Sequence, residues 1–406
     1  MQSDYIIFTM EKIINRQRQL LNLTQTEHVR SIYHDINWNS RLIAIRGAKG
    51  VGKTTLMLQY IKMCGADAKR MLYASLDSAY FTQHSLLDFA DNFHKRGGEH
   101  LFLDEVHKYD TWSKEVKEIY DLYPDLKVVL SGSSLLSILN GDADLSRRCI
   151  PYDIQGMSFR EYLDIVHDIV LPKVQLDELL ENPNALCEKV MQSCRPLSFF
   201  DDYLREGYYP FILEGQAEYS IRLENVINYI IEVELPKLCG VDVSNVRKLK
   251  ALVAVLSSNV PQQVDMQKLS TMLEVSRVTL LGYFQHLAKA KVLNLLYSSE
   301  MNIKKMQKPD KIFVENPNIM DAMTLDTVNK GSKRECFIVN QLRNSHRVEY
   351  TKQGDFLVDG RYTIEVGGKS KDGKQIAGLE NAFIAADDTE YAYGNKIPLW
   401  AFGFLY

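Results

Sequence analysis

A glycine-rich stretch near the N-terminus carries the strongest chemical signal in the sequence. Residues 47–55 fit the pattern G-x-x-x-x-G-K-[ST] directly after a short apolar run. In such a loop the glycines let backbone N–H groups point at phosphate oxygens, and the helix that follows adds its positive N-terminal end. The expected phosphate-binding residues are Gly47, Ala48, Lys49, Gly50, Val51, Gly52, Lys53, Thr54 and Thr55.

Two adjacent carboxylates are the expected partners of this loop. The apolar run 100–103 ends in Asp104 and Glu105. We expect Lys53 to neutralise the β- and γ-phosphates of ATP, Thr54 and Asp104 to hold Mg²⁺, and Glu105 to polarise the attacking water. Adjacent carboxylates on a helix surface are commonly only solvated, but that explanation fits poorly after an apolar strand. The pair therefore favours hydrolysis over a GTPase-like switch.

Further polar candidates follow in the same region. Ser131 or Ser133, at the end of a third apolar run, is expected beside the γ-phosphate. The alternative is a helix N-cap before Leu135 and Leu136. A later pair, Arg147 and Arg148, offers an arginine finger that would reach the γ-phosphate of a neighbouring subunit. The alternative is a surface pair of basic residues, and the sequence does not separate the two arginines.

A second set of carboxylates lies in the last ninety residues or so. Asp355 in one apolar strand and Glu365 on the next strand of a hairpin resemble the D…E-x-K nuclease signature, in which carboxylates hold a divalent metal ion. Glu335 could add a ligand. The lysine departs from the signature, because it comes only at Lys369, with Lys371 as a second candidate. A nuclease-like fold kept for protein contacts or for holding DNA is the equal alternative.

Short apolar runs must position the first group of residues. These runs alternate with amphipathic stretches, which is the pattern of a parallel sheet covered by helices on both faces. Before them, the first forty residues read as helix, and after them the pattern is helical from about residue 158 to 240. The runs are 42–45, 71–74, 101–103, 128–130 and 150–154.

These motifs together resemble bacterial and archaeal AAA-superfamily ATPases that carry a C-terminal domain of the restriction-nuclease-like type. The resemblance covers nearly the whole chain. It implies a core sheet of strand order 5-1-4-3-2 and a tendency to form homo-oligomers. Besides the loop at Lys53 it rests on Leu-Asp-Glu at 103–105, Gly-Ser-Ser at 132–134, Ser-Arg-Arg at 146–148, the segment 156–163, and Glu-Gly-Tyr-Tyr-Pro at 206–210, where that group has Gly-Gly-Tyr-Pro.

The middle of the chain predicts a winged helix-turn-helix. Residues 248–297 divide into three helical stretches and a strand, with Ser276 as the N-cap of the third helix and Val278, Leu281, Phe284 and Ala288 expected on its buried face. Residues 245–311 hold eleven basic and four acidic side chains, so this block carries +7. We expect it to contact the DNA backbone, with Arg277 on the recognition helix. The alternative is packing against its own nucleotide domain.

Composition and overall charge exclude several classes of protein. The 406 residues carry 48 basic and 52 acidic side chains, which gives a net charge of −4. Because residues 245–311 carry +7, the remaining residues together carry −11. The six cysteines form no C-x-x-C pair, which argues against a zinc ribbon and a disulfide framework. No apolar run is long enough to span a membrane, and the N-terminus lacks a secretory signal, so a cytoplasmic protein is expected.

The sequence therefore predicts an α/β P-loop NTPase of AAA type, an all-α and winged-helix region, and an α/β nuclease-like C-terminal domain. We expect Mg²⁺-dependent ATP hydrolysis coupled to binding of double-stranded DNA. The alternatives are an ATP-regulated, metal-dependent DNA nuclease and an ATP-driven protein-interaction switch without nucleic acid. The expected parts are an N-terminal helical segment (1–40), the ATPase domain (41–160), a helical lid (161–244), the basic winged helix and hinge (245–311), and the nuclease-like domain (312–406).

Overall fold

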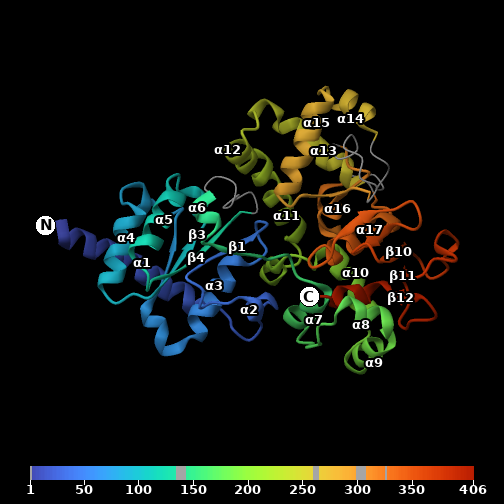
Figure 1. Cartoon of the computed structure of the whole chain (residues 1–406), viewed down its shortest axis with the longest axis horizontal. Helices are drawn as coiled ribbons and strands as arrows, with labels where there is room; N and C mark the ends of the chain where they lie inside the picture. The colour runs from blue at the N-terminus through green and yellow to red at the C-terminus, as the bar shows by residue number, and fades with distance from the viewer. Residues whose placement is uncertain (1, 134–142, 259–264, 299–307, 325–326) are drawn as a thin grey trace. The chain divides into compact units, whose positions relative to one another are not determined.

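The chain divides into two compact units, which are coloured from blue to red along the sequence in Figure 1. Unit 1 comprises Met1–Gln155 and unit 2 comprises Gly156–Tyr406. The computed structural model describes residues 2–133, 143–258, 265–298, 308–324 and 327–406. Within these residues, none of the helices is both long and apolar enough to cross a membrane. The five-part division expected from the sequence is finer than these two units and stays a prediction.

Five parallel strands form the centre of unit 1 in the order β2-β3-β4-β1-β5. Read from the opposite edge, this is the order 5-1-4-3-2 that the AAA resemblance implies, so that prediction is confirmed. All of these strands except β5 are buried along most of their length, because helices cover both faces of the sheet. The strands are β1 (Leu42–Gly47), β2 (Met71–Ser75), β3 (His100–Asp104), β4 (Lys127–Ser133) and β5 (Ile150–Asp153).

The helices of unit 1 pack on this sheet through apolar faces. One core combines α4 and α5 with alternate residues of four strands, and Met10 and Ile13 of α1 join it. Ser85 begins α4, because its hydroxyl accepts the backbone N–H of Asp88 at 3.0 Å. The helices are α1 (Gln2–Leu23), α2 (Ile32–Asp35), α3 (Lys53–Met63), α4 (Leu86–Lys95), α5 (Trp112–Leu122) and α6 (Ala143–Ser146).

The N-terminal helix expected over the first forty residues is interrupted. Helix α1 ends at Leu23 and α2 begins only at Ile32, which leaves residues 24–31 as an irregular segment. Side chains of α3 donate to backbone carbonyls of this segment and so hold its irregular conformation in place. Periodicity in the sequence does not reveal these tertiary contacts.

Unit 2 begins with a helical region. Ser158 caps α7 in a reciprocal arrangement, since its hydroxyl accepts the N–H of Glu161 while the Glu161 carboxylate accepts the N–H of Ser158. Asn318 holds the segment after α10 in place, because its side-chain oxygen accepts the N–H of Tyr208 at 2.8 Å. The helices of this region are α7 (Phe159–His167), α8 (Leu176–Glu181), α9 (Pro183–Ser193), α10 (Leu197–Glu206), α11 (Tyr219–Tyr229) and α12 (Leu235–Cys239).

Three helices and an antiparallel ribbon follow, as the sequence predicted for this region. Ser276 caps the third helix as expected, but of the four residues predicted on its buried face only Phe284 is fully buried. Val278 is 80% exposed, and Leu280, Tyr283 and Leu287 join Phe284 in the core at the spacing of one helical face. The elements are α13 (Val246–Ser258), α14 (Met266–Leu273), α15 (Arg277–Lys289), β6 (Leu293–Leu296) and β7 (Lys311–Val314). The hinge residues Lys304 and Lys305 lie outside the described residues.

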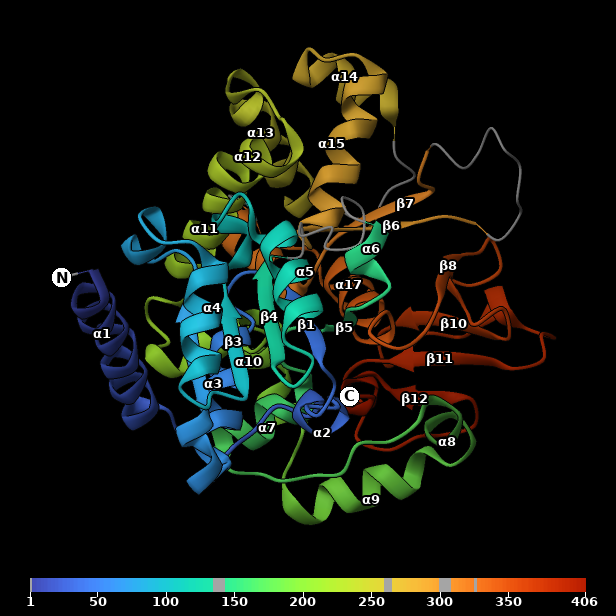
Figure 2. The same ribbon diagram turned by 60° about the vertical axis from the view of Figure 1, so that its left-hand side comes forward.

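A second, mixed sheet closes unit 2, and Figure 2 shows β10, β11 and β12 side by side. Its order is β12-β11-β10-β9-β8, with β8, β9 and β10 antiparallel and β10, β11 and β12 parallel. The expected hairpin is present, but Asp355 precedes its strand instead of lying in it. The elements are α16 (Pro317–Met323), α17 (Lys330–Leu342), β8 (Val348–Tyr350), β9 (Phe356–Val358), β10 (Tyr362–Gly367), β11 (Ala382–Ala386) and β12 (Lys396–Pro398).

Candidate functional site

The glycine-rich loop joins β1 to α3 at the C-terminal edge of the sheet in unit 1. Gly50 and Gly52 have φ angles of 87° and 96°, a backbone region that favours glycine. Gly47 is needed for a different reason, because a Cβ atom there would lie 2.4 Å from the carbonyl oxygen of Ile154. The loop therefore depends on its glycines for conformation and for close packing.

Lys53 begins α3 and lies inside the loop. Its side chain is buried, and its ammonium donates to the carbonyl oxygens of Gly47 and Ala48, both at 2.9 Å. These bonds fold the lysine back onto the start of the loop. The positive charge and the helix N-terminus are thus held at one place, which suits an anionic ligand.

Asp104 is the centre of the polar contacts at this edge of the sheet. Its Oδ2 accepts the hydroxyl of Thr54 at 2.6 Å and the hydroxyl of Tyr73 at 2.7 Å. Its Oδ1 accepts the hydroxyl of Ser131 and the backbone N–H of Glu105, the latter at 3.0 Å. The side chain of Asp104 is only 2% exposed, so these donors replace the water that a carboxylate would otherwise bind.

Tyr73 is a residue of this site that sequence reasoning missed. Burial, followed by the nearby charge of Asp104, raises the pKa of Tyr73 well above its usual value, which keeps the phenol as a hydrogen-bond donor. Gln17 of α1 fixes its strand, because the Gln17 side chain accepts the N–H of Tyr73 at 2.7 Å and donates to the carbonyl of Met71 at 3.2 Å. The sequence did offer one signal for this role, because Tyr73 is a hydroxyl-bearing residue within an apolar run.

Glu105 follows β3 directly, and both serines lie at the end of β4, as expected. Glu105 has a φ of 54°, an unusual backbone conformation for a residue other than glycine. His107 Nε2 lies 3.4 Å from its carboxylate. Ser131 contacts Asp104, while Ser133 is buried at the end of β4. Ser134, Leu135 and Leu136 lie outside the described residues, so the alternative of an N-cap is not tested.

The oxygen atoms at this edge fit a magnesium ion. Thr54 and Asp104 supply a hydroxyl and a carboxylate that already lie within 2.6 Å of each other. Mg²⁺ prefers such oxygen ligands and usually keeps several waters, so it needs few ligands from the protein. The described part of the chain holds no group of three or more His, Cys, Asp and Glu residues arranged to hold a metal ion.

Comparison with known proteins identifies this part of the chain. Residues 39–163 match a family model described as an AAA domain, and the match contains the loop, Asp104, Glu105 and both candidate arginines. Unit 1 contains an AAA-superfamily P-loop ATPase domain. A second family model, described as a domain of unknown function, matches residues 198–329.

Relatives of most of the chain are known in an archaeon. Two proteins of Methanocaldococcus jannaschii, both described as uncharacterized, are 27% identical over 371 residues (84% of this chain, 78% of the relative) and 22% identical over 376 residues (86% and 79%). Among solved structures, the Aeropyrum pernix ORC1 protein in complex with DNA is 13% identical with a TM-score of 0.31 (76% of this chain, 90% of that chain). AMPPCP-bound DnaA from Aquifex aeolicus is 18% identical with a TM-score of 0.27 (64% and 84%). The assignment rests on the family match and the strand order, not on these two alignments.

The two candidate arginines of the AAA domain have different surroundings. Arg148 lies 3.2 Å from the carboxylate of Asp121 and 5.8 Å from the ring centre of Tyr120. Arg147 has an exposed side chain just after α6. The guanidinium of Arg148 is thus held by its own unit, and its side chain is less exposed than that of Arg147.

A separate cluster of charges lies in unit 2. The ammonium of Lys311 is 3.0 Å from Glu335 and 3.6 Å from Asp355, and that of Lys371 is 2.9 Å from Glu365. Burial, opposed by Lys311, raises the pKa of Glu335. As arranged, the three carboxylates are paired with lysines, and the described residues form no metal-binding group here either.

Lys371, not Lys369, has its ammonium beside Glu365. A Cβ atom on Gly367 would lie 2.8 Å from the side-chain carbons of Lys371, so the stem of this lysine occupies the space of the missing side chain. Lys369 is exposed. Burial by itself would lower the pKa of Lys371, but the hydrogen bond and charge of Glu365 raise it.

We expect Tyr73→Phe to destabilise the AAA domain, because buried Asp104 loses one of its donors. The free energy of unfolding should fall by about 1–3 kcal/mol. Urea denaturation without nucleotide measures the change. Tyr393→Phe is the control for loss of a phenol hydroxyl, since Tyr393 is 85% exposed. Equal stability of the Tyr73 variant and the control would contradict the donor role.

Proposed function

We propose that the protein binds ATP with Mg²⁺ and hydrolyses it. The observation that carries this proposal is the contact of Thr54 with Asp104, next to a buried Lys53 in a glycine-rich loop. Residues Gly47 to Thr55 would bind the phosphates, with Lys53 on the β- and γ-phosphates. Thr54 and Asp104 would hold Mg²⁺, which neutralises charge on the phosphates.

Three further residues would act on the γ-phosphate. Glu105 would orient and deprotonate the attacking water as general base, and Ser131 would stay beside the phosphate through Asp104. Of the two arginines, we propose Arg147 as the finger, because its side chain is exposed whereas that of Arg148 is only partly exposed. A finger acts on a neighbouring subunit, so the active form would be a homo-oligomer.

All six cysteines are free thiols, in keeping with a cytoplasmic location.

Two substitutions separate binding from hydrolysis. Lys53→Ala removes the positive charge in the loop and should lower ATP affinity by about 10-fold or more. Glu105→Gln keeps the shape but removes the base, so ATP binding should persist while kcat falls about 10²- to 10⁴-fold. Equilibrium binding and steady-state hydrolysis measure the two effects. A Lys53→Ala protein with normal ATP hydrolysis would disprove the site.

We further propose that α13, α14, α15 and the ribbon form a winged helix that binds double-stranded DNA and that the nucleotide state of unit 1 alters this binding. Arg277 supports this, because it is exposed at the first turn of α15 and lines a groove with residues of α14. The basic block is weaker than its charge of +7 suggests. Lys311 is held by carboxylates, and Lys250 pairs with Glu232.

Salt dependence tests this proposal against the alternative of a protein-interaction switch. Arg277→Ala should weaken duplex binding and reduce the slope of log affinity against log salt by about 1, because one phosphate contact is lost. Lys250→Ala is the control, since that lysine is paired with Glu232 and should change the slope little. Titrations of duplex DNA at several salt concentrations, with ATP hydrolysis recorded in parallel, measure both. Absence of DNA binding would favour the switch.

A second candidate function is a metal-dependent DNA nuclease regulated by ATP. The position of Lys371 favours it, since its stem over Gly367 brings an ammonium to Glu365 as the signature requires. Buried Glu365 Oε2 also has no hydrogen-bond partner among the described residues, which suits a ligand to a cation. Asp355, Glu365 and Glu335 would hold the metal, and Lys311 would have to leave Glu335 and Asp355 first.

If the protein is a nuclease, two different substitutions should cause the same loss of DNA cleavage. Glu365→Gln and Lys371→Met should both abolish cleavage of plasmid DNA with Mg²⁺ or Mn²⁺, because metal and scissile phosphate lose their ligands. Lys369→Met is the matched control and should cleave normally, because its side chain is exposed. No cleavage by the unaltered protein with either metal would exclude this function.

A further inference from the structure

Residues 24–31, here called the strap, join α1 to α2 and precede the range that matches the AAA domain. Side chains of the P-loop helix α3 fasten it. Gln59 donates to the carbonyl oxygens of Gln25 and His28 at 2.9 and 2.8 Å, and Lys62 donates to that of Thr24 at 2.6 Å. The strap therefore has a defined position beside the nucleotide loop although it lies outside the matched domain.

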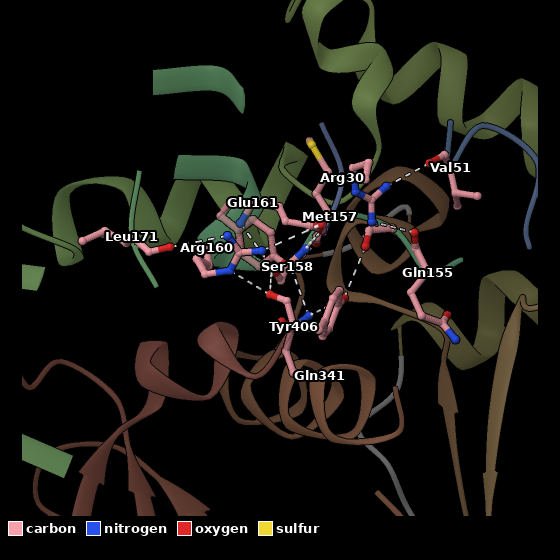
Figure 3. A network of polar contacts seen from close by, with 12 residues as sticks. Arg30, Val51, Gln155, Met157, Ser158, Arg160, Glu161, Leu171, Gln341 and Tyr406 are labelled. Carbon is pink, nitrogen blue, oxygen red and sulfur yellow. Dashed lines mark hydrogen bonds and ion pairs between the residues drawn. The ribbon is translucent and has the colours of Figure 1, made fainter. Parts of the chain in front are cut away.

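Arg30 extends from the strap to the nucleotide loop itself, as Figure 3 shows. Its Nη1 donates to the carbonyl oxygen of Val51 and its Nη2 to that of Gln155, both at 2.9 Å. The side chain is 7% exposed. A guanidinium presents several donors in a rigid planar fork, so it can hold two backbone carbonyls in one fixed geometry.

The carbonyl of Val51 is a sensitive point in the loop. It belongs to the peptide that joins Val51 to Gly52, and a planar trans peptide directs its C=O and N–H to opposite sides. A donor on the Val51 carbonyl therefore sets the direction of the Gly52 N–H. On the Gly52 side this peptide is restrained little by sterics, because Gly52 lacks a side chain and has a positive φ angle.

The second carbonyl connects the loop to the end of unit 1. Gln155 follows Ile154, whose backbone packs directly on Gly47. The N–H of Ile154 donates to the carbonyl of Arg46 at 2.8 Å. Contacts thus join the segment 154–155 to the start of the loop. Arg30 of the strap contacts both this segment and the glycine turn of the loop.

We propose that Arg30 is a positioning residue for nucleotide binding, which orients the Gly52 N–H toward the phosphates by holding the Val51 carbonyl. This inference rests on the proposed function of the loop as the ATP site. A backbone N–H of this kind contacts phosphate in ATP and ADP alike. Arg30 therefore affects the affinity of both nucleotides and leaves the chemical step to Asp104 and Glu105.

The test measures affinity for fluorescent analogues of ATP and ADP without Mg²⁺, and kcat at saturating ATP with Mg²⁺. Arg30→Met keeps the apolar stem and should weaken both affinities about 10-fold or more, because charged hydrogen bonds to the loop are lost. Arg30→Lys keeps the charge but not the fork, so its loss should be smaller. In both variants kcat should stay within about 2-fold of the unaltered protein.

Arg46→Met is the matched control, since Arg46 lies next to the loop on β1 but pairs with the Asp153 side chain at 2.7 Å. Its affinities should not change. Hydrogen exchange should show faster exchange in residues 47–55 of Arg30→Met, with the other strands of the sheet unchanged. Affinities within 2-fold of the unaltered protein in Arg30→Met, or in Arg30→Lys if the former does not fold, would overturn the inference.

Lys53→Ala in the same assay separates this inference from the proposed function. If Lys53→Ala binds nucleotide normally, the ATP site itself is wrong. If Lys53→Ala loses binding while Arg30→Met retains it, only the role of Arg30 is wrong. A fall in kcat without a change in affinity would also contradict a positioning role in the loop.

Discussion

The buried carboxylate of Asp104 is the constraint on which the nucleotide site depends. At the end of β3, with 2% of its side chain exposed, it stays compatible with the core because four donors converge on it. The strand order supplies them, since β3 lies between β2 with Tyr73 and β4 with Ser131. Thr54 comes from α3, which follows β1 on the far side of β4. The geometry of the site therefore depends on the order and register of the strands in the sheet.

The two units hold their clustered carboxylates in different ways. In unit 1 the donors to buried Asp104 are hydroxyls and a backbone N–H. In unit 2 the half-buried carboxylates of Glu335 and Asp355 share the single ammonium of Lys311, a residue of the ribbon. A divalent cation would have to compete with that lysine. The metal ligands that we propose in unit 1 therefore need no lysine to leave, whereas those in unit 2 require a rearrangement first.

The sequence predicted the motifs that are formed by consecutive residues. It did not predict the contacts between residues that lie far apart in the chain. The glycine loop and the Asp-Glu pair are read from a few consecutive residues, and the AAA resemblance supplied the strand order. Arg30 and Gln17 carry no local pattern, because their roles depend on contacts with residues more than twenty and fifty positions away. Val278 was misplaced because an apolar side chain can lie on the exposed face of a helix. Lys371 was only a second candidate, since the sequence does not show that its stem would lie over Gly367.

The most direct test of this account is a crystal structure of the protein with Mg²⁺ and a non-hydrolysable ATP analogue. We expect the phosphates against the N–H groups of residues 50–54 and the metal ion at the oxygens of Thr54 and Asp104. We also expect the ammonium of Lys53 to leave the carbonyls of Gly47 and Ala48 for the β- and γ-phosphates, while Arg30 keeps its bond to Val51. A nucleotide bound elsewhere, or a metal ion that does not approach Asp104, would contradict it.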